Sequence, residues 1–174
     1  MILCLVPLIP LAGAIASLAP VRRSSEASSL ASSLALFITC SFLLEKVRVE
    51  KLILECGEEL LADELSVAVL FTISIVFLFA SVYSIKYVDK LFVEGRFQRK
   101  KLYYFLLQLF TMTMVSTCLM NNLFLLWVAI EATTLASAFL IAIKRDPVSL
   151  EAAWKYVILC TCLLYTSPSP RDRG

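Results

Sequence analysis

One acidic residue, Glu131, stands where a charge could do chemistry. It lies in a run from Leu123 to Ile143 that contains no other charged residue. As a helix this run would be roughly 30 Å long, the thickness of the hydrocarbon core of a bilayer. A charged side chain at that depth costs about 2.5 to 3.5 kcal/mol on insertion scales, and such residues most often relay protons or ions. Glu131 is therefore a candidate proton relay, and the alternative is a protonated Glu that only hydrogen-bonds a neighbouring helix.

On the helical face around Glu131, the side chains are mostly small toward the C-terminal end and aromatic toward the N-terminal end. The side chains predicted to lie within about 60° of it are Phe124, Trp127, Thr134, Leu135, Ala138 and Ala142. The small residues at 134, 138 and 142 would let water or another helix approach the carboxylate. Trp127, one turn to the other side, could cap the site. Simple packing is the alternative reading of the small residues.

The composition places the chain in a membrane. Hydrophobic residues make up 60% of the sequence and the mean hydropathy is +0.85, far above the range of ordinary globular domains. The chain has no His, its six Cys form no CxxC pair, and no phosphate-binding glycine motif is present. We therefore expect no metal and no cofactor, so that any associated redox chemistry would reside on a partner. Nothing in the charge distribution indicates nucleic-acid binding.

The apolar runs predict an all-α fold, a polytopic transmembrane helix bundle with five spans and a truncated sixth. The expected spans are Ile2 to Leu18, Ala27 to Leu44, Leu65 to Ile85, Leu102 to Met120 and Leu123 to Ile143, with the sixth beginning near Ala152. The second is rich in Ser. Small residues four apart favour close helix contact, namely Gly13 with Ser17, Ser28 with Ser32, and Ala31 with Ala35.

The loop charges predict the orientation. Eleven Lys and Arg follow the first, third and fifth spans, whereas three follow the second and none follows the fourth. Because basic loops stay in the cytoplasm, we expect a multi-pass protein of the cell inner membrane with its N-terminus outside. The outer segment Glu45 to Glu64 alternates at Val47, Val49, Leu52 and Leu54 before Gly57, which indicates a small strand or hairpin.

Two stretches resemble a known family. They are Trp127-Val-Ala-Ile-Glu131-Ala-Thr-Thr134-Leu and Glu151-Ala-Ala-Trp154-Lys155-Tyr156, preceded by Asp63-Glu64-Leu65-Ser66 and by 103–111. Together they are similar to the antiporter-like membrane subunits of complex I, Mrp cation/proton antiporters and energy-converting hydrogenases. The similarity is greatest to the component of hydrogenase-4 that is designated F. The resemblance covers roughly Leu61 to Cys160.

The resemblance implies roles for two residues. In that family a fifth-span glutamate, which Glu131 matches, pairs with a seventh-span lysine and helps to gate proton transfer. Lys155 matches a lysine at the start of the sixth span and becomes a second candidate for the proton path. Its alternative is structural, because Glu151 and Lys155 form an i, i+4 pair on one helix.

The end of the chain differs from the rest. From Cys162 the apolar run gives way to a polar, Pro-rich peptide that looks like the translation of a transposase sequencing adapter. We therefore expect residues 1–161 to be the N-terminal part of a longer membrane subunit and residues 162–174 to be an artefactual tail. The alternative is a native polar terminus.

Two classes of function remain. The first is a fragment of a proton-translocating membrane subunit of a redox-driven complex, of the hydrogenase-4 or NADH-quinone oxidoreductase type, with Glu131 as the relay and no redox centre of its own. An Mrp-type antiporter subunit is the alternative within this class. The second is a purely structural bundle. In both classes the partners of the chain would be the lipid bilayer and other membrane subunits, and in the first class it would also bind protons.

Overall fold

The computed structural model describes residues 2–18, 24–50, 52–55, 60–91, 97–143 and 146–166. This part of the chain is almost entirely helical. Its elements are α1 (Ile2–Ser17), α2 (Ser24–Glu50), β1 (Leu52–Glu55), β2 (Leu60–Asp63), α3 (Glu64–Leu91), α4 (Phe97–Leu119), α5 (Leu123–Ala142) and α6 (Pro147–Thr166). The prediction of an all-α bundle is confirmed at this level.

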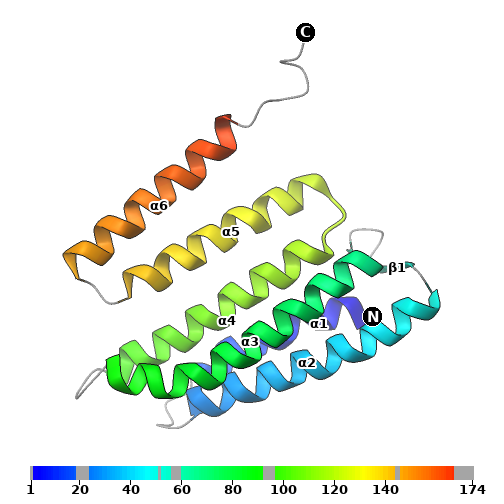
Figure 1. Ribbon diagram of the computed structural model, residues 1–174, viewed down its shortest axis with the longest axis horizontal. Helices are drawn as coiled ribbons and strands as arrows, with labels where there is room; N and C mark the ends of the chain where they lie inside the picture. Colours follow the sequence, from blue (N-terminus) through cyan, green and yellow to red (C-terminus); the bar gives the residue numbers. More distant parts are fainter. Residues whose placement is uncertain are drawn as a thin grey trace.

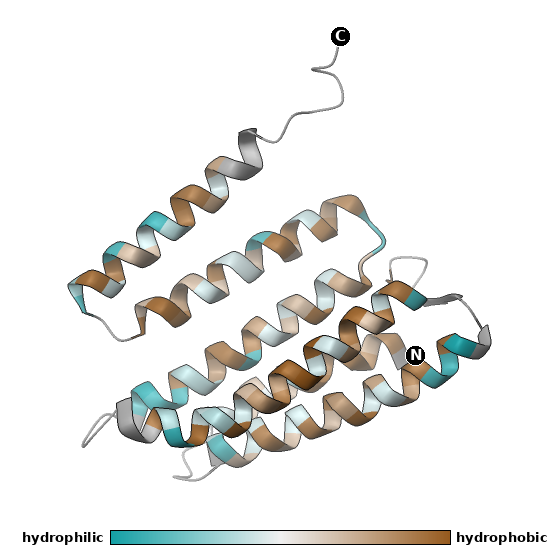
Figure 2. Cartoon of the chain, in the orientation of Figure 1, coloured by the Kyte–Doolittle hydropathy of each residue, from teal (hydrophilic) through white to brown (hydrophobic). Residues whose placement is uncertain are grey.

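The first four helices form a bundle, and the last two extend it in one direction. The most extensive contacts join α2 with α3, α1 with α4, and α1 with α2, whereas α5 packs on α4 and α6 packs on α5 (Figure 1). Successive helices run in opposite directions. Hydrophilic residues gather at the helix ends, and the middle of the bundle is mostly apolar (Figure 2).

In the described part of the chain, four helices are long and apolar enough to cross a membrane. They are α2, α3, α4 and α5, with candidate spans Ser25–Arg48, Glu64–Val88, Gln98–Leu119 and Leu123–Ala142. Large apolar side chains stay exposed along these helices, among them Phe42, Phe79 and Phe139. A surface of that kind suits contact with lipid. The chain is thus a multi-pass membrane protein.

That the first and the last helix, α1 and α6, also cross the membrane stays a prediction. Helix α1 has 16 residues, so it is about 24 Å long and shorter than the hydrocarbon core. It contains Pro7 and Pro10, which remove backbone donors but are tolerated more easily in membrane helices than in soluble ones. Helix α6 begins at Pro147, five residues before the predicted start at Ala152. Proline suits the first position of a helix, and the backbone N–H of Leu150 donates to the carbonyl of Asp146.

Several hydroxyls of the Ser-rich helix α2 donate to backbone carbonyls of the same helix. Ser28 donates to the carbonyl of Ser25 at 3.1 Å, Ser33 to that of Leu30 at 2.9 Å, and Thr39 to that of Ala35 at 2.7 Å. A hydroxyl that bonds its own helix can enter the membrane without an unmet donor. This explains how a helix with so many serines forms the predicted second span, and α2 extends that span at both ends.

A hairpin follows α2, as the alternation indicated. β1 pairs antiparallel with β2, with Leu52 opposite Asp63 and Glu55 opposite Leu60. Leu60 also forms a bridge with Met120 at the end of α4, so the hairpin lies at the end of the bundle where α4 turns into α5. Val47 and Val49 were predicted to belong to the strand pattern but lie in α2. Gly57 lies outside the described residues.

The interior of the bundle has two apolar clusters. The larger one lies toward the hairpin and includes Leu36, Leu43, Leu70 and Leu119. The smaller one lies toward the other end and consists of Val88, Tyr104, Leu106 and Ile143. Buried polar side chains lie between these clusters in the sequence of α3 and α4, namely Ser81, Ser84, Gln108 and Thr111.

Candidate functional site

Glu131 lies near the middle of α5 and faces α6. The hydroxyl of Thr161 donates to its Oε1 at 3.4 Å, which is a long contact. Its Oε2 is buried and has no hydrogen-bond partner among the described residues. The position is therefore half-satisfied: one carboxyl oxygen has a weak donor, and the other is withdrawn from solvent without one.

Helix α5 is positioned by its N-terminus. Asn122 has an extended backbone, and its side-chain oxygen accepts the N–H of Phe124 at 3.0 Å. This cap starts the helix directly after the short connection to α4. Because the helix runs uninterrupted from Leu123 to Ala142, it carries Glu131 to about half of its length.

A second polar contact joins α5 and α6. Ser137 donates to the carbonyl of Thr134 at 2.7 Å and lies 3.2 Å from the hydroxyl of Tyr156. Thr134 in turn donates to the backbone carbonyl of Glu131 at 2.7 Å. A row of hydroxyls thus follows the α5–α6 interface away from Glu131, toward the connection between the two helices.

Sequence reasoning missed Thr161 and Tyr156 as neighbours of this face. A signal for them existed, since two antiparallel helices joined by a short loop bring together residues equally distant from that loop. Glu131 and Thr161 each lie fifteen residues from Asp146. Ser137 and Tyr156 lie nine and ten residues from it. Placing the turn correctly would have identified both pairs.

The predicted face around Glu131 is only partly an interior one. Ala138 is buried, whereas Leu135 is exposed. Phe124 and Trp127 contact each other and are 67% and 48% exposed. Trp127 helps to line an open hollow of about 740 Å³ at the start of α5, and Glu131 does not line it. The capping role for Trp127 stays a prediction.

Lys155 and Glu131 are not brought together. The ammonium of Lys155 binds the carboxylate of Glu151 at 2.5 Å, and both side chains are largely exposed, at 70% and 64%. Lys155 also precedes Thr161 by six residues, so it lies about 9 Å closer to the start of α6 than Thr161 does, and on another face of that helix. The observed geometry is that of the i, i+4 surface pair.

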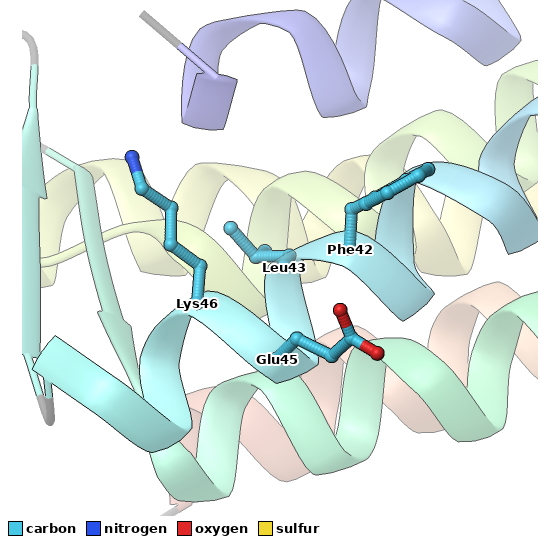
Figure 3. Close-up of a pocket in the computed structure, with 4 residues that line it drawn as sticks. All are labelled: Phe42, Leu43, Glu45 and Lys46. Carbon is cyan, nitrogen blue, oxygen red and sulfur yellow. The ribbon is translucent and has the colours of Figure 1, made fainter.

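Two other hollows lie near the C-terminal end of α2, and Glu131 lines neither of them. One of about 440 Å³ on α2 is lined by Phe42, Leu43, Glu45 and Lys46. Figure 3 shows the charged ends of Glu45 and Lys46 pointing away from each other. No group of three or more His, Cys, Asp or Glu that could hold a metal ion occurs in the part of the chain that the structure describes. Cys4 is disulfide-bonded, a feature that sequence reasoning did not predict, whereas the thiols of Cys40 and Cys118 are free.

The chain is similar to a known membrane-complex component over part of its length. No family model matches the chain. The sequence is 30% identical over 105 residues to a protein described as a hydrogenase-4 component F homolog from Methylacidiphilum infernorum (isolate V4). The matched region is 59% of this chain and 22% of the relative, so the chain spans a small part of the relative's length. This similarity agrees with the antiporter-like membrane proteins that the sequence motifs resemble, and it extends to one portion of such a protein.

Proposed function

We propose that this chain is part of a proton-translocating membrane subunit of a redox-driven complex of the hydrogenase-4 type. Glu131 is the residue that takes up and releases the proton. The chain has no redox role of its own in this proposal, and the electrons move in partner subunits. The membrane helices and the similarity to a hydrogenase-4 component F homolog support this assignment.

The single observation that carries the proposal is the state of the Glu131 carboxyl group. A buried carboxyl oxygen without a donor is costly inside a membrane, where no bulk water can replace the missing bond. Protonation removes the charge, and the approach of a cation or of water stabilises it. A group in this position can therefore alternate between two states when its surroundings change. In the family that the sequence resembles, the approaching cation is a lysine on a later span.

The orientation is part of the same proposal. Helices α2, α4 and α6 begin at the end of the bundle where α1, α3 and α5 finish. In the sequence, most of the Lys and Arg fall in or near the three connections that join these helix ends. Basic loops favour the cytoplasmic side, so the N-terminus of α1 is placed outside the inner membrane. The disulfide bond of Cys4, near that N-terminus, suits an oxidising compartment.

The test uses the complete subunit within its complex. Glu131→Gln keeps the size of the side chain and its capacity to hydrogen-bond, but it removes the proton-exchanging group. We expect assembly of the complex to be unchanged and redox-driven acidification of membrane vesicles to fall at least tenfold. Glu45→Gln is the matched control, because Glu45 is an exposed residue near the end of α2. Acidification at the wild-type level in a normally assembled Glu131→Gln complex would refute the relay.

A structural role is the second candidate, and one observation favours it. Glu131 touches Thr161 across the α5–α6 interface, so it could serve only to hold these helices together. Glutamine would then serve almost equally well, since either side chain can accept the Thr161 hydroxyl. The same experiment separates the two roles. An Mrp-type antiporter would instead be recognised by cation-dependent proton exchange in vesicles without a redox substrate.

A further inference from the structure

Gln108 is a fully buried amide at the centre of the four-helix bundle. It lies on α4 and has no exposed surface. Its Nε2 donates to the hydroxyl of Ser32 on α2 at 2.5 Å. Ser32 donates to the carbonyl of Ser29, and the hydroxyl of Ser29 donates to that of Ser81 on α3 at 3.2 Å. Three helices therefore meet at one polar cluster, made of Gln108, Ser32, Ser29 and Ser81.

The fourth helix contributes a position without a side chain. A Cβ atom on Gly13 of α1 would lie 2.8 Å from Nε2 of Gln108 and 2.8 Å from Cβ of Ser32. The absence of a side chain at Gly13 is what lets the amide fit between α1 and α2. Ser17, one turn farther along α1, is also fully buried. All four helices of the bundle therefore enclose the cluster.

The amide is nevertheless only half satisfied. Its Oε1 is buried and has no hydrogen-bond partner among the described residues. Rotating the amide by 180° would not remove the problem. Ser32 already donates its hydrogen to Ser29, so it needs a donor and not an acceptor from Gln108. In either orientation one end of the amide is left without a partner in the described part of the chain.

An unmet carbonyl oxygen is costly in this position. Burial without a hydrogen bond destabilises a protein, and the destabilisation is greater in the interior of a membrane, where no bulk water can replace the missing bond. Buried polar groups of this kind are commonly satisfied by an internal water molecule, which needs two to four polar partners. Two are present: Oε1 of Gln108 and the second lone pair of the Ser32 hydroxyl. A water molecule can donate one hydrogen to each.

We propose that the cluster formed by Gln108, Ser32, Ser29 and Ser81 is a binding site for one water molecule, held by Oε1 of Gln108 inside the membrane. The site is separate from Glu131 and does not depend on the proposed proton relay. It connects α4 to α2 through a bridging water in addition to the direct bond between Gln108 and Ser32. Ser32 is bonded to the backbone carbonyl of Ser29, whose own hydroxyl makes a separate bond to Ser81 on α3. Gly13 provides the room that the amide needs.

The direct test is a high-resolution structure of the complete subunit in its complex, determined for the wild type and for Gln108→Met. Methionine has a similar length and no hydrogen-bonding amide. We expect a density peak about 2.5–3.0 Å from Oε1 in the wild type and no peak at the same place in the variant. The absence of this peak in a wild-type map that shows other internal waters would overturn the proposal, as would a protein group in contact with Oε1.

A second measurement uses thermal stability. If water satisfies Oε1, Gln108→Met removes a complete set of bonds and the midpoint of unfolding, Tm, falls by several degrees. If Oε1 has no partner, the same change removes an unmet polar group and loses only the direct bond from Nε2 to Ser32, so that Tm stays equal or rises. Gln98→Met is the matched control, because it makes the same substitution at an exposed position of α4. A Tm for Gln108→Met equal to or above that of the wild type would also overturn the proposal.

Discussion

Gly13 is the position where the smallest substitution is expected to have the largest effect on the bundle. In Gly13→Ala, the new Cβ would lie 2.8 Å from Cβ of Ser32, which is 0.6 Å inside the 3.4 Å at which ordinary contact begins. Gln108 can rotate its amide away, but Cβ of Ser32 is fixed by the α2 backbone. Helices α1 and α2 must therefore separate, and the bond between Gln108 and Ser32 is disturbed.

The expected magnitude follows from opposing terms. Overpacking of a close interface costs about 1–3 kcal/mol, and an interhelical hydrogen bond in a membrane contributes about 0.6 kcal/mol. Alanine is favoured over glycine within a helix by roughly 0.5–1 kcal/mol, which offsets part of this loss. We expect the free energy of unfolding of Gly13→Ala to be lower by about 1–2 kcal/mol.

The assay is reversible unfolding in mixed micelles, followed by circular dichroism. Ala12→Leu is the control, since it adds more volume one residue earlier on an exposed side of α1. The penalty should shrink in a Ser32→Gly background, where the fixed neighbour is removed, and a double-mutant cycle measures that difference. A Gly13→Ala protein as stable as the wild type would refute the close approach of α1 and α2 at this point.

Three further predictions concern other parts of the chain. Thr161→Val removes the hydroxyl that donates to Glu131, and it should lower the free energy of unfolding, measured by the same unfolding assay, by about 0.6 kcal/mol. A loss above about 2 kcal/mol would contradict the weak contact in the structure. A cysteine placed at Arg96 should react with impermeant thiol reagents from the cytoplasmic side, and labelling from outside would reverse the proposed orientation. Adapter-independent sequencing of the source DNA should diverge from residues 162–174, and recovery of these codons would establish them as native.

Several features of the fold could be predicted from local sequence. Long apolar runs identified α2 to α5 because in a membrane the backbone bonds must be satisfied within the segment, which leaves the helix as the simplest solution. The hairpin of β1 with β2 was predicted in the right segment. The exact ends of the helices were harder to predict from the sequence. Helix α6 begins at Pro147 and not near Ala152, because a proline and a preceding Asp can start a helix in a polar stretch that hydropathy overlooks.

Some features of the candidate site could also be predicted from local sequence, and others depended on how the helices pack. Local sequence was enough to predict that Glu131 is a lone charge at membrane depth, since the prediction depends only on its place within an apolar run. Helix packing was needed to show that Thr161 faces it, whereas the pair of Lys155 with Glu151 follows from their i, i+4 spacing on one helix and was one of the two alternatives that the sequence offered. Gln108, one polar residue in an apolar run, carried no signal of its importance. Its meaning depends on Gly13 and Ser32, which are distant in sequence and meet it only when four helices pack together.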